Sequence, residues 1–113
     1  ISISKKCIVI KHFGGSRDKW EYTHRYRFQN GDWYLIGASA SFGAPCDYWV
    51  KFDYNISTGD ATYKKTVENC ENGEKKIIQS QKSNKKISTP KMDSVTPGDS
   101  TFKFPNIKDE IYY

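Results

Sequence analysis

The sequence predicts an all-β protein, an antiparallel meander of five to six strands that forms a twisted sheet or a small sandwich or half-barrel. Three observations predict this class. Aromatic residues make up 15% of the chain, and rings favour the half-buried face of a sheet. Apolar and polar side chains alternate in several runs, which is the period of a strand. Two Asn-Gly pairs, Asn30-Gly31 and Asn72-Gly73, follow such runs, and this dipeptide favours a tight hairpin turn.

The chain length fits one domain. A chain of 113 residues is close to the commonest domain size and has room for one core. Residues 1–80 carry the strand patterns and are predicted to form an antiparallel β domain. Residues 81–113 lack periodicity and are predicted to form an irregular tail, containing Lys and Pro, that packs back on the same domain. The apolar residues expected to hold this tail are Phe102, Phe104, Ile107, Ile111, Tyr112 and Tyr113.

The first half of the meander centres on one hairpin. Residues 6–13 form a strand. Side chains alternate without a break over residues 20–29, and the partner strand, residues 32–38, follows the Asn-Gly turn. A two-residue turn pairs Gln29 with Asp32. The face predicted to be core carries Trp20, Tyr22, His24, Tyr26, Phe28, Trp33 and Leu35, and the opposite face carries Arg25, Arg27, Tyr34 and Ile36.

The second half contains three further strands. Residues 39–45 are small and are predicted to form a loop. Residues 47–56 alternate again, with Trp49 on the polar side of the strand. Residues 61–69 return after a turn, and residues 75–80 form the last short strand.

The positions of two cysteines depend on the register of the second hairpin, which pairs residues 47–55 with residues 61–69. If Asn55 lies opposite Ala61, Cys46 faces Cys70 and a disulfide between them is possible. Matching the apolar faces instead places Tyr54 opposite Ala61, and this one-residue shift puts the two sulfurs on opposite faces. A bulge would reconcile the two arrangements. The alternatives are therefore a Cys46–Cys70 disulfide or three free thiols, since free cysteine behaves as a small apolar residue.

Two stretches resemble a known group of proteins. Residues 26–37 are YRFQNGDWYLIG, and residues 54–59 are YNISTG. Both are similar to the C-terminal β-region of uncharacterised, exported bacterial proteins that carry a YRFQNGxWxLIG … YNxxTG pattern. The resemblance covers about residues 8–90. It implies an antiparallel β architecture and a periplasmic, cell-envelope or secreted location, and it implies no known chemistry.

The sequence contains few residues that could serve as metal ligands or as a catalytic nucleophile and base. His12 and His24 are the two histidines, and with Asp18 they could form a metal site only from separate segments, whereas zinc ligands usually come as closely spaced pairs. The sequence has no Gly-x-Ser-x-Gly elbow, and no spacing pairs Cys7 with a histidine. The sequence therefore predicts a protein that is not an enzyme and needs no metal or cofactor.

The charge indicates the class of partner. The net charge is +5 and the isoelectric point is about 9.1, which favours anionic neighbours. The predicted function is a non-catalytic binding or interaction domain of an exported bacterial protein, with a protein or an anionic polymer or polysaccharide as partner. Inhibitor and immunity-type roles fall within this class. The candidate binding residues are Trp49, Tyr48, Lys51, Lys75, Lys76, Lys85 and Lys86.

Each candidate has a second interpretation. Trp49 could present a flat ring to a sugar, which is the alternative function of a carbohydrate-binding module, or it could be buried beneath the tail. The lysines could contact an anionic partner or protect a sheet edge from pairing. Nucleic acid is not expected as the partner, because the predicted rings lie on the face opposite Arg25 and Arg27. No window approaches the ~20 apolar residues of a membrane span.

Overall fold

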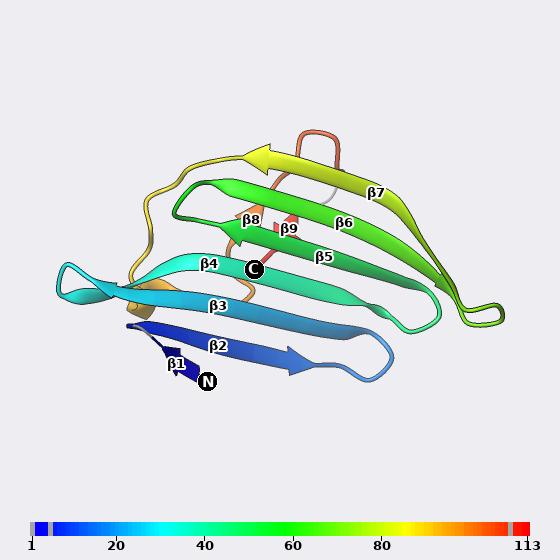
Figure 1. Ribbon diagram of the computed structural model, residues 1–113, viewed down its shortest axis with the longest axis horizontal. Coiled ribbons are helices and arrows are strands. Elements are labelled where there is room, and N and C mark those ends of the chain that lie inside the picture. Colours follow the sequence, from blue (N-terminus) through cyan, green and yellow to red (C-terminus); the bar gives the residue numbers. More distant parts are fainter. Residues whose placement is uncertain (1, 5, 109) are drawn as a thin grey trace.

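The computed structural model describes residues 2–4, 6–108 and 110–113. Among these residues, seven strands form one antiparallel sheet whose spatial order is the order of the chain (Figure 1). The strands are β1 (Ser2–Ser4), β2 (Cys7–Gly14), β3 (Lys19–Gln29), β4 (Asp32–Ala44), β5 (Tyr48–Asn55), β6 (Asp60–Asn69) and β7 (Glu74–Asn84). The predicted all-β class and antiparallel meander are confirmed.

The first hairpin has the predicted register. Gln29 pairs with Asp32, and Phe28 pairs with Trp33. Asn30 and Gly31 both have positive φ, of 51° and 79°. A two-residue turn of this hand matches the twist of the flanking strands, and Asn and Gly adopt it at the lowest cost.

A β-bulge follows in β4. Tyr26 pairs with Leu35 but Arg25 pairs with Gly37, so that Ile36 is an extra residue. The carbonyl of Ile36 accepts a hydrogen bond from the backbone N–H of Ile56 at 3.0 Å. The bulge changes which residues of β4 face the core.

The loop predicted at residues 39–45 is wrong, because β4 continues through Ala44. Small residues have weak intrinsic preference for strands. Here residues 39–43 pair on both sides, with β3 and with β5, and the two ladders outweigh that preference. The prediction relied on composition, and the pairing partners decided the outcome.

Three further differences concern the ends of the chain. β1 pairs with β2 and was not predicted. β7 reaches Asn84, four residues beyond the predicted end of the last strand. The predicted irregular tail contains a short 3-10 helix, η1 (Met92–Ser94), and two paired strands, β8 (Thr101–Phe102) and β9 (Ile111–Tyr112). We refer to residues 85–113 as the C-terminal segment.

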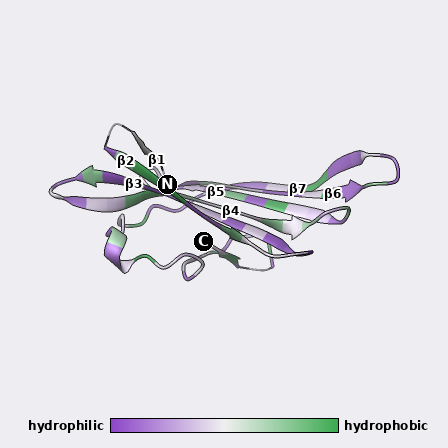
Figure 2. Cartoon of the chain, turned by 90° about the horizontal axis from the view of Figure 1, so that it is seen from below, coloured by the Kyte–Doolittle hydropathy of each residue, from purple (hydrophilic) through white to green (hydrophobic). Residues whose placement is uncertain are grey.

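The C-terminal segment lies along one side of the sheet (Figure 2). Its rings pack on rings of β5, with centroids 4.8 Å apart for Tyr54 and Phe102 and 5.9 Å apart for Phe52 and Phe104. Five of the six residues expected to hold the tail are buried, and Tyr112 is 53% exposed. The face of the sheet under this segment is called the covered face. Its buried residues in the sheet are His24, Tyr26, Leu35, Ala38, Ala40, Ala44, Val50, Phe52, Tyr54, Ala61 and Tyr63.

The face predicted to be core is the covered face, and burial follows the extent of the cover. His24, Tyr26 and Leu35 are buried. Trp20 and Phe28, at the two ends of β3, are each 41% exposed. The core prediction is therefore correct for the middle of the strand and wrong for its ends.

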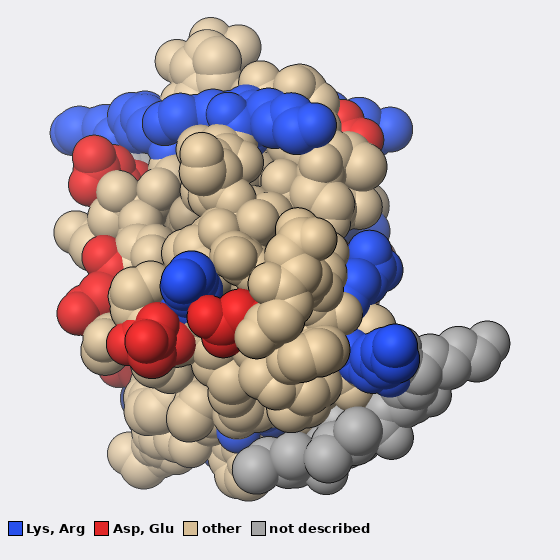
Figure 3. Space-filling model, turned by 90° about the vertical axis from the view of Figure 1, so that its left-hand side faces the viewer, with Lys and Arg blue, Asp and Glu red and all other residues tan. Residues whose placement is uncertain are grey.

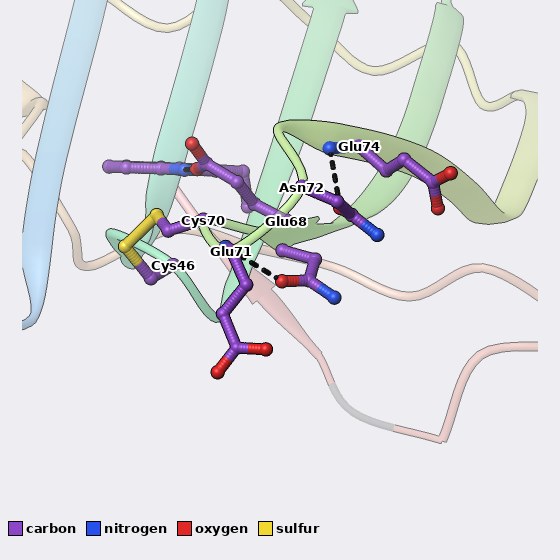
Figure 4. The surroundings of a disulfide bond; sticks show 8 residues. Cys46, Glu68, Cys70, Glu71, Asn72 and Glu74 are labelled. Carbon is purple, nitrogen blue, oxygen red and sulfur yellow. Dashed lines mark hydrogen bonds between the residues drawn. A yellow bond between two sulfur atoms is a disulfide. The ribbon is translucent and has the colours of Figure 1, made fainter.

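Both alternatives for the second hairpin are partly right. Tyr54 pairs with Ala61, which is the register that the apolar faces favour. Cys46 and Cys70 nevertheless form a disulfide, with Cα atoms 5.1 Å apart. Cys46 lies in the β4–β5 turn with a φ of 65°, outside the ladder, and Cys70 follows the end of β6 (Figure 4). Because neither cysteine belongs to the paired strands, the register does not separate them.

Candidate binding surface

The face of the sheet opposite the C-terminal segment has no chain above it among the described residues (Figure 2). We call it the open face. Its side chains are polar or small along most of its area, and they are the residues that alternate with those of the covered face. A sheet with one covered and one solvated face is typical of antiparallel folds.

A groove runs along β4 on the open face. Its floor consists of alternate small residues, Gly37, Ser39, Ser41 and Gly43. Three adjoining hollows of about 390, 520 and 330 Å³ follow this floor. Neighbouring hollows share lining residues, so they form one continuous depression, which we call the β4 groove. Hollows of this size are within the range of ligand-binding sites.

Residues of β3 and β5 form the walls of the β4 groove. The wall from β3 is formed by Lys19, Glu21, Thr23 and Arg25, and the wall from β5 by Trp49, Lys51, Asp53 and Asn55. The walls therefore combine cations, carboxylates and neutral hydrogen-bonding groups. This mixture suits a polar ligand better than an apolar one.

A flat group lies over the glycine at each end of the floor. A side chain on Gly37 would come within 3.3 Å of a guanidinium nitrogen of Arg25. A side chain on Gly43 would come within 2.9 Å of the ring of Trp49 and would clash with the Tyr48 carbonyl oxygen. Glycine at these positions therefore gives the guanidinium and the indole room to lie close to the strand.

Trp49 is held in place by a hydrogen bond. Its indole N–H donates to Oε2 of Glu68 at 2.9 Å, and the side chain is half-buried. Glu68 lies near the disulfide in Figure 4. Phe13, 77% exposed, lines the same end hollow. Because Trp49 lies on the open face, it is not beneath the C-terminal segment. This end of the groove therefore has one ring held by a hydrogen bond, Trp49, and one solvent-exposed ring, Phe13.

One carboxylate of the groove is oriented from its floor. The hydroxyl of Ser39 donates to Oδ1 of Asp53 at 2.5 Å. A carboxylate that accepts one such bond keeps other lone pairs for a ligand that donates hydrogen bonds.

The structure separates the predicted binding residues. Trp49 and Lys51 lie together on the open face. Tyr48 lies on the covered face, where Nζ of Lys65 is 5.3 Å from its ring centroid. Trp49 and Tyr48 therefore cannot bind the same sugar.

The other four predicted lysines are also separated from one another. Lys75 and Lys76 begin β7, near the disulfide, whereas Lys85 and Lys86 follow its other end. The two pairs are about 30 Å apart at the rise of an extended strand. Figure 3 shows one end of the molecule, where Lys and Arg side chains lie across the β7 side and acidic side chains gather nearer the middle.

The histidines and Cys7 lie on opposite faces of the sheet. Among the described residues, no three side chains of the metal-binding types form a cluster. His12 and His24 lie 6.4 Å apart as ring centroids on the covered face, whereas Cys7 pairs with Arg27 and lies on the open face. A thiol–imidazole pair cannot form across the sheet.

Sequence reasoning missed the floor of the groove. Residues 37–44 are small at every position except Phe42, so the sequence does not show which of them share a face. This composition predicts a loop. The pairing of β4 with β3 and β5 places Gly37, Ser39, Ser41 and Gly43 on one face, where they leave a depression between taller neighbours.

Comparisons of the chain with protein-family models, curated proteins and solved structures find no match. Within the described residues, no helix has both the length and the apolar character needed to cross a membrane.

Proposed function

We propose that the chain is a non-catalytic binding domain of an exported bacterial protein and that it binds its partner through the open face of the sheet. The observation that carries this proposal is the β4 groove, a depression lined mainly by charged and hydrogen-bonding residues on a face that the rest of the described chain leaves free. A rigid sheet positions side chains more accurately than a loop does, which suits recognition.

Two observations support an exported location. Disulfides persist mainly in oxidising compartments, and Cys46 is bonded to Cys70. The YRFQNG and YNISTG stretches resemble those of exported bacterial proteins. Both support the periplasm, the cell envelope or the extracellular space as the place where the domain works.

A filled groove tests the proposal. Ser41→Tyr places a ring on the floor, and Ser80→Tyr is a matched control, because Ser80 lies in the same row of the open face but on β7. The probes are acidic and neutral polysaccharides, an oligothymidylate and anionic lipid vesicles, measured by calorimetry or co-sedimentation. We expect at least one probe to bind the unmodified protein and Ser80→Tyr, and to bind Ser41→Tyr about tenfold less tightly, a loss of ~1.4 kcal/mol.

Two results would contradict the proposal. One is equal binding of every probe by both variants, which would move the partner to another surface. The other is chemical conversion of a bound probe, detected by chromatography, because a binding domain leaves its ligand unchanged.

A carbohydrate-binding module is the second candidate, and the position of Trp49 favours it. A half-buried indole fixed by Glu68 offers one ring face at the end of a polar groove. Rings with a polar partner are suited to contacts that are apolar on one side and wet on the other.

A further inference from the structure

We propose that the β4 groove binds an acidic polysaccharide, whose chain lies along β4 with an acidic group on Arg25 and a sugar ring on Trp49. This inference rests on the proposed function and names its ligand. It is carried by three features of the groove, namely its charge, its carboxylates and the flat groups at its two ends.

The charge of the open face complements a polyanion. Basic side chains occur in every row of residues that crosses the β4 groove, and they outnumber the acidic ones. The basic residues of these rows are Lys11, Lys19, Arg25, Lys51, Lys64 and Lys82, and the acidic residues are Glu21 and Asp53. Arg27 and Asp60 add one charge of each sign to the hollow at the Arg25 end. A chain with acidic groups can therefore meet a cation at successive positions along the groove.

The two carboxylates of the central hollow indicate which class of polyanion the groove can accept. Glu21 and Asp53 line the central hollow. A nucleic acid strand has a charged phosphate at every nucleotide, and some of these phosphates would lie against the carboxylates at a cost. A polysaccharide also presents hydroxyl groups, and these donate to carboxylates. Lining that combines cations with carboxylates thus favours a sugar acid over a nucleic acid.

The flat groups at the ends match two parts of such a chain. The guanidinium of Arg25 lies over Gly37 and can bind a carboxylate through two parallel hydrogen bonds. The indole of Trp49 lies over Gly43 and can stack on the apolar face of a sugar ring. The two glycines are about 20 Å apart along the strand, so the ligand is an extended chain and not a single sugar.

The test compares acidic and neutral chains on charge-matched variants. The double variant Arg25→Gln/Lys51→Gln removes two cations from the groove. The control Lys103→Gln/Lys108→Gln removes two exposed cations of the C-terminal segment, so both proteins have the same net charge. The probes are an oligogalacturonate, a neutral xylan oligosaccharide of similar length and an oligothymidylate, and affinity is measured by calorimetry at two salt concentrations.

We expect the oligogalacturonate to bind most tightly, and to bind about tenfold less tightly to the groove variant but within about twofold to the control. Added salt weakens the binding. Trp49→Ala, checked for folding by denaturation, weakens it about tenfold as well. Stronger binding of the oligothymidylate, or equal losses in the two double variants, would overturn this inference.

One result would overturn the inference while leaving the proposed function intact. If the neutral oligosaccharide binds as tightly as the acidic one and Ser41→Tyr still abolishes its binding, the groove is a binding site but is not specific for acidic chains. If Ser41→Tyr has no effect on any probe, both proposals fail.

Discussion

The covered and open faces are built from alternate residues of the same strands, yet they differ in almost every property. On β4, Ala38 and Ala40 lie under rings of the C-terminal segment, while Ser39 and Ser41 lie on the floor of an open groove. Small residues therefore serve two purposes on one strand. On the covered face they make room for a second layer, and on the open face they leave a depression for a ligand.

The largest expected effect on stability comes from the C-terminal segment, which forms the layer over the covered face. Phe104→Ala should lower the free energy of unfolding by about 4 kcal/mol, because Phe104 is fully buried against Phe52, Tyr63 and Phe102. Urea denaturation measures the loss. The control Tyr112→Ala, at a side chain 53% exposed, should cost less than ~1 kcal/mol. Similar losses in the two variants would show that the segment does not cover the sheet.

The next effect comes from the end of the sheet, which belongs to neither face. Replacing Cys46 and Cys70 by alanine should lower the free energy of unfolding by about 3 kcal/mol, as expected for a bridge between residues 24 apart. Cys7→Ala is the control and should change little. A reductant should lower the stability of the unmodified protein to that of the double variant, and no response to reductant would argue against the bond.

Lowering the pH should destabilise the fold through His24, which is buried on the covered face. Burial, and then the charge of nearby His12, lower the pKa of His24 from 6.5 to about 4. Neither ring nitrogen has a hydrogen-bond partner among the described residues. The unfolded chain therefore binds a proton at His24 more readily than the folded chain does. The contribution of neutral His24 to the free energy of unfolding is fully present above pH 6.5 and is lost as the pH falls towards 4.

The expected loss is about 2 kcal/mol between roughly pH 7 and pH 5. Denaturation across this range measures it. His24→Phe keeps a ring in the core and should remove most of the slope, whereas His12→Gln should retain it. An unchanged slope in His24→Phe would assign the acid response to other groups.

The smallest effect compares two neighbours on β4. Ala40→Leu should cost about 1 kcal/mol or more, because Ala40 is 1% exposed in the packed core. Ser41→Leu should change stability by less than ~0.5 kcal/mol, because its side chain points into the open groove. Thermal or urea denaturation distinguishes them. Equal costs would mean that both faces are packed.

The sequence predicted what local rules determine. Asn30-Gly31 predicted the turn and the pairing of Gln29 with Asp32, and matched apolar faces predicted Tyr54 opposite Ala61. These features depend on φ angles and on a period of two, both of which can be read from a single strand or turn.

The remaining features depend on contacts between distant segments. At the bulge, the carbonyl of Ile36 accepts a hydrogen bond from the backbone N–H of Ile56, which follows the end of β5, and no local sequence pattern predicts this contact. The exposure of Trp20 and Phe28 depends on how far the C-terminal segment reaches. The groove was missed for the same reason, since a depression is a property of three adjacent strands.

The strand order has a consequence for how the protein folds. Each strand of the large sheet pairs with its neighbour in sequence, so hairpins can form as they emerge during synthesis, and such local contacts favour rapid folding. The rings of β5 and β6, by contrast, acquire their cover only when residues 101–113 arrive. Until that moment the nascent sheet displays an aromatic surface to chaperones, proteases and other chains, and a truncated product would keep displaying it.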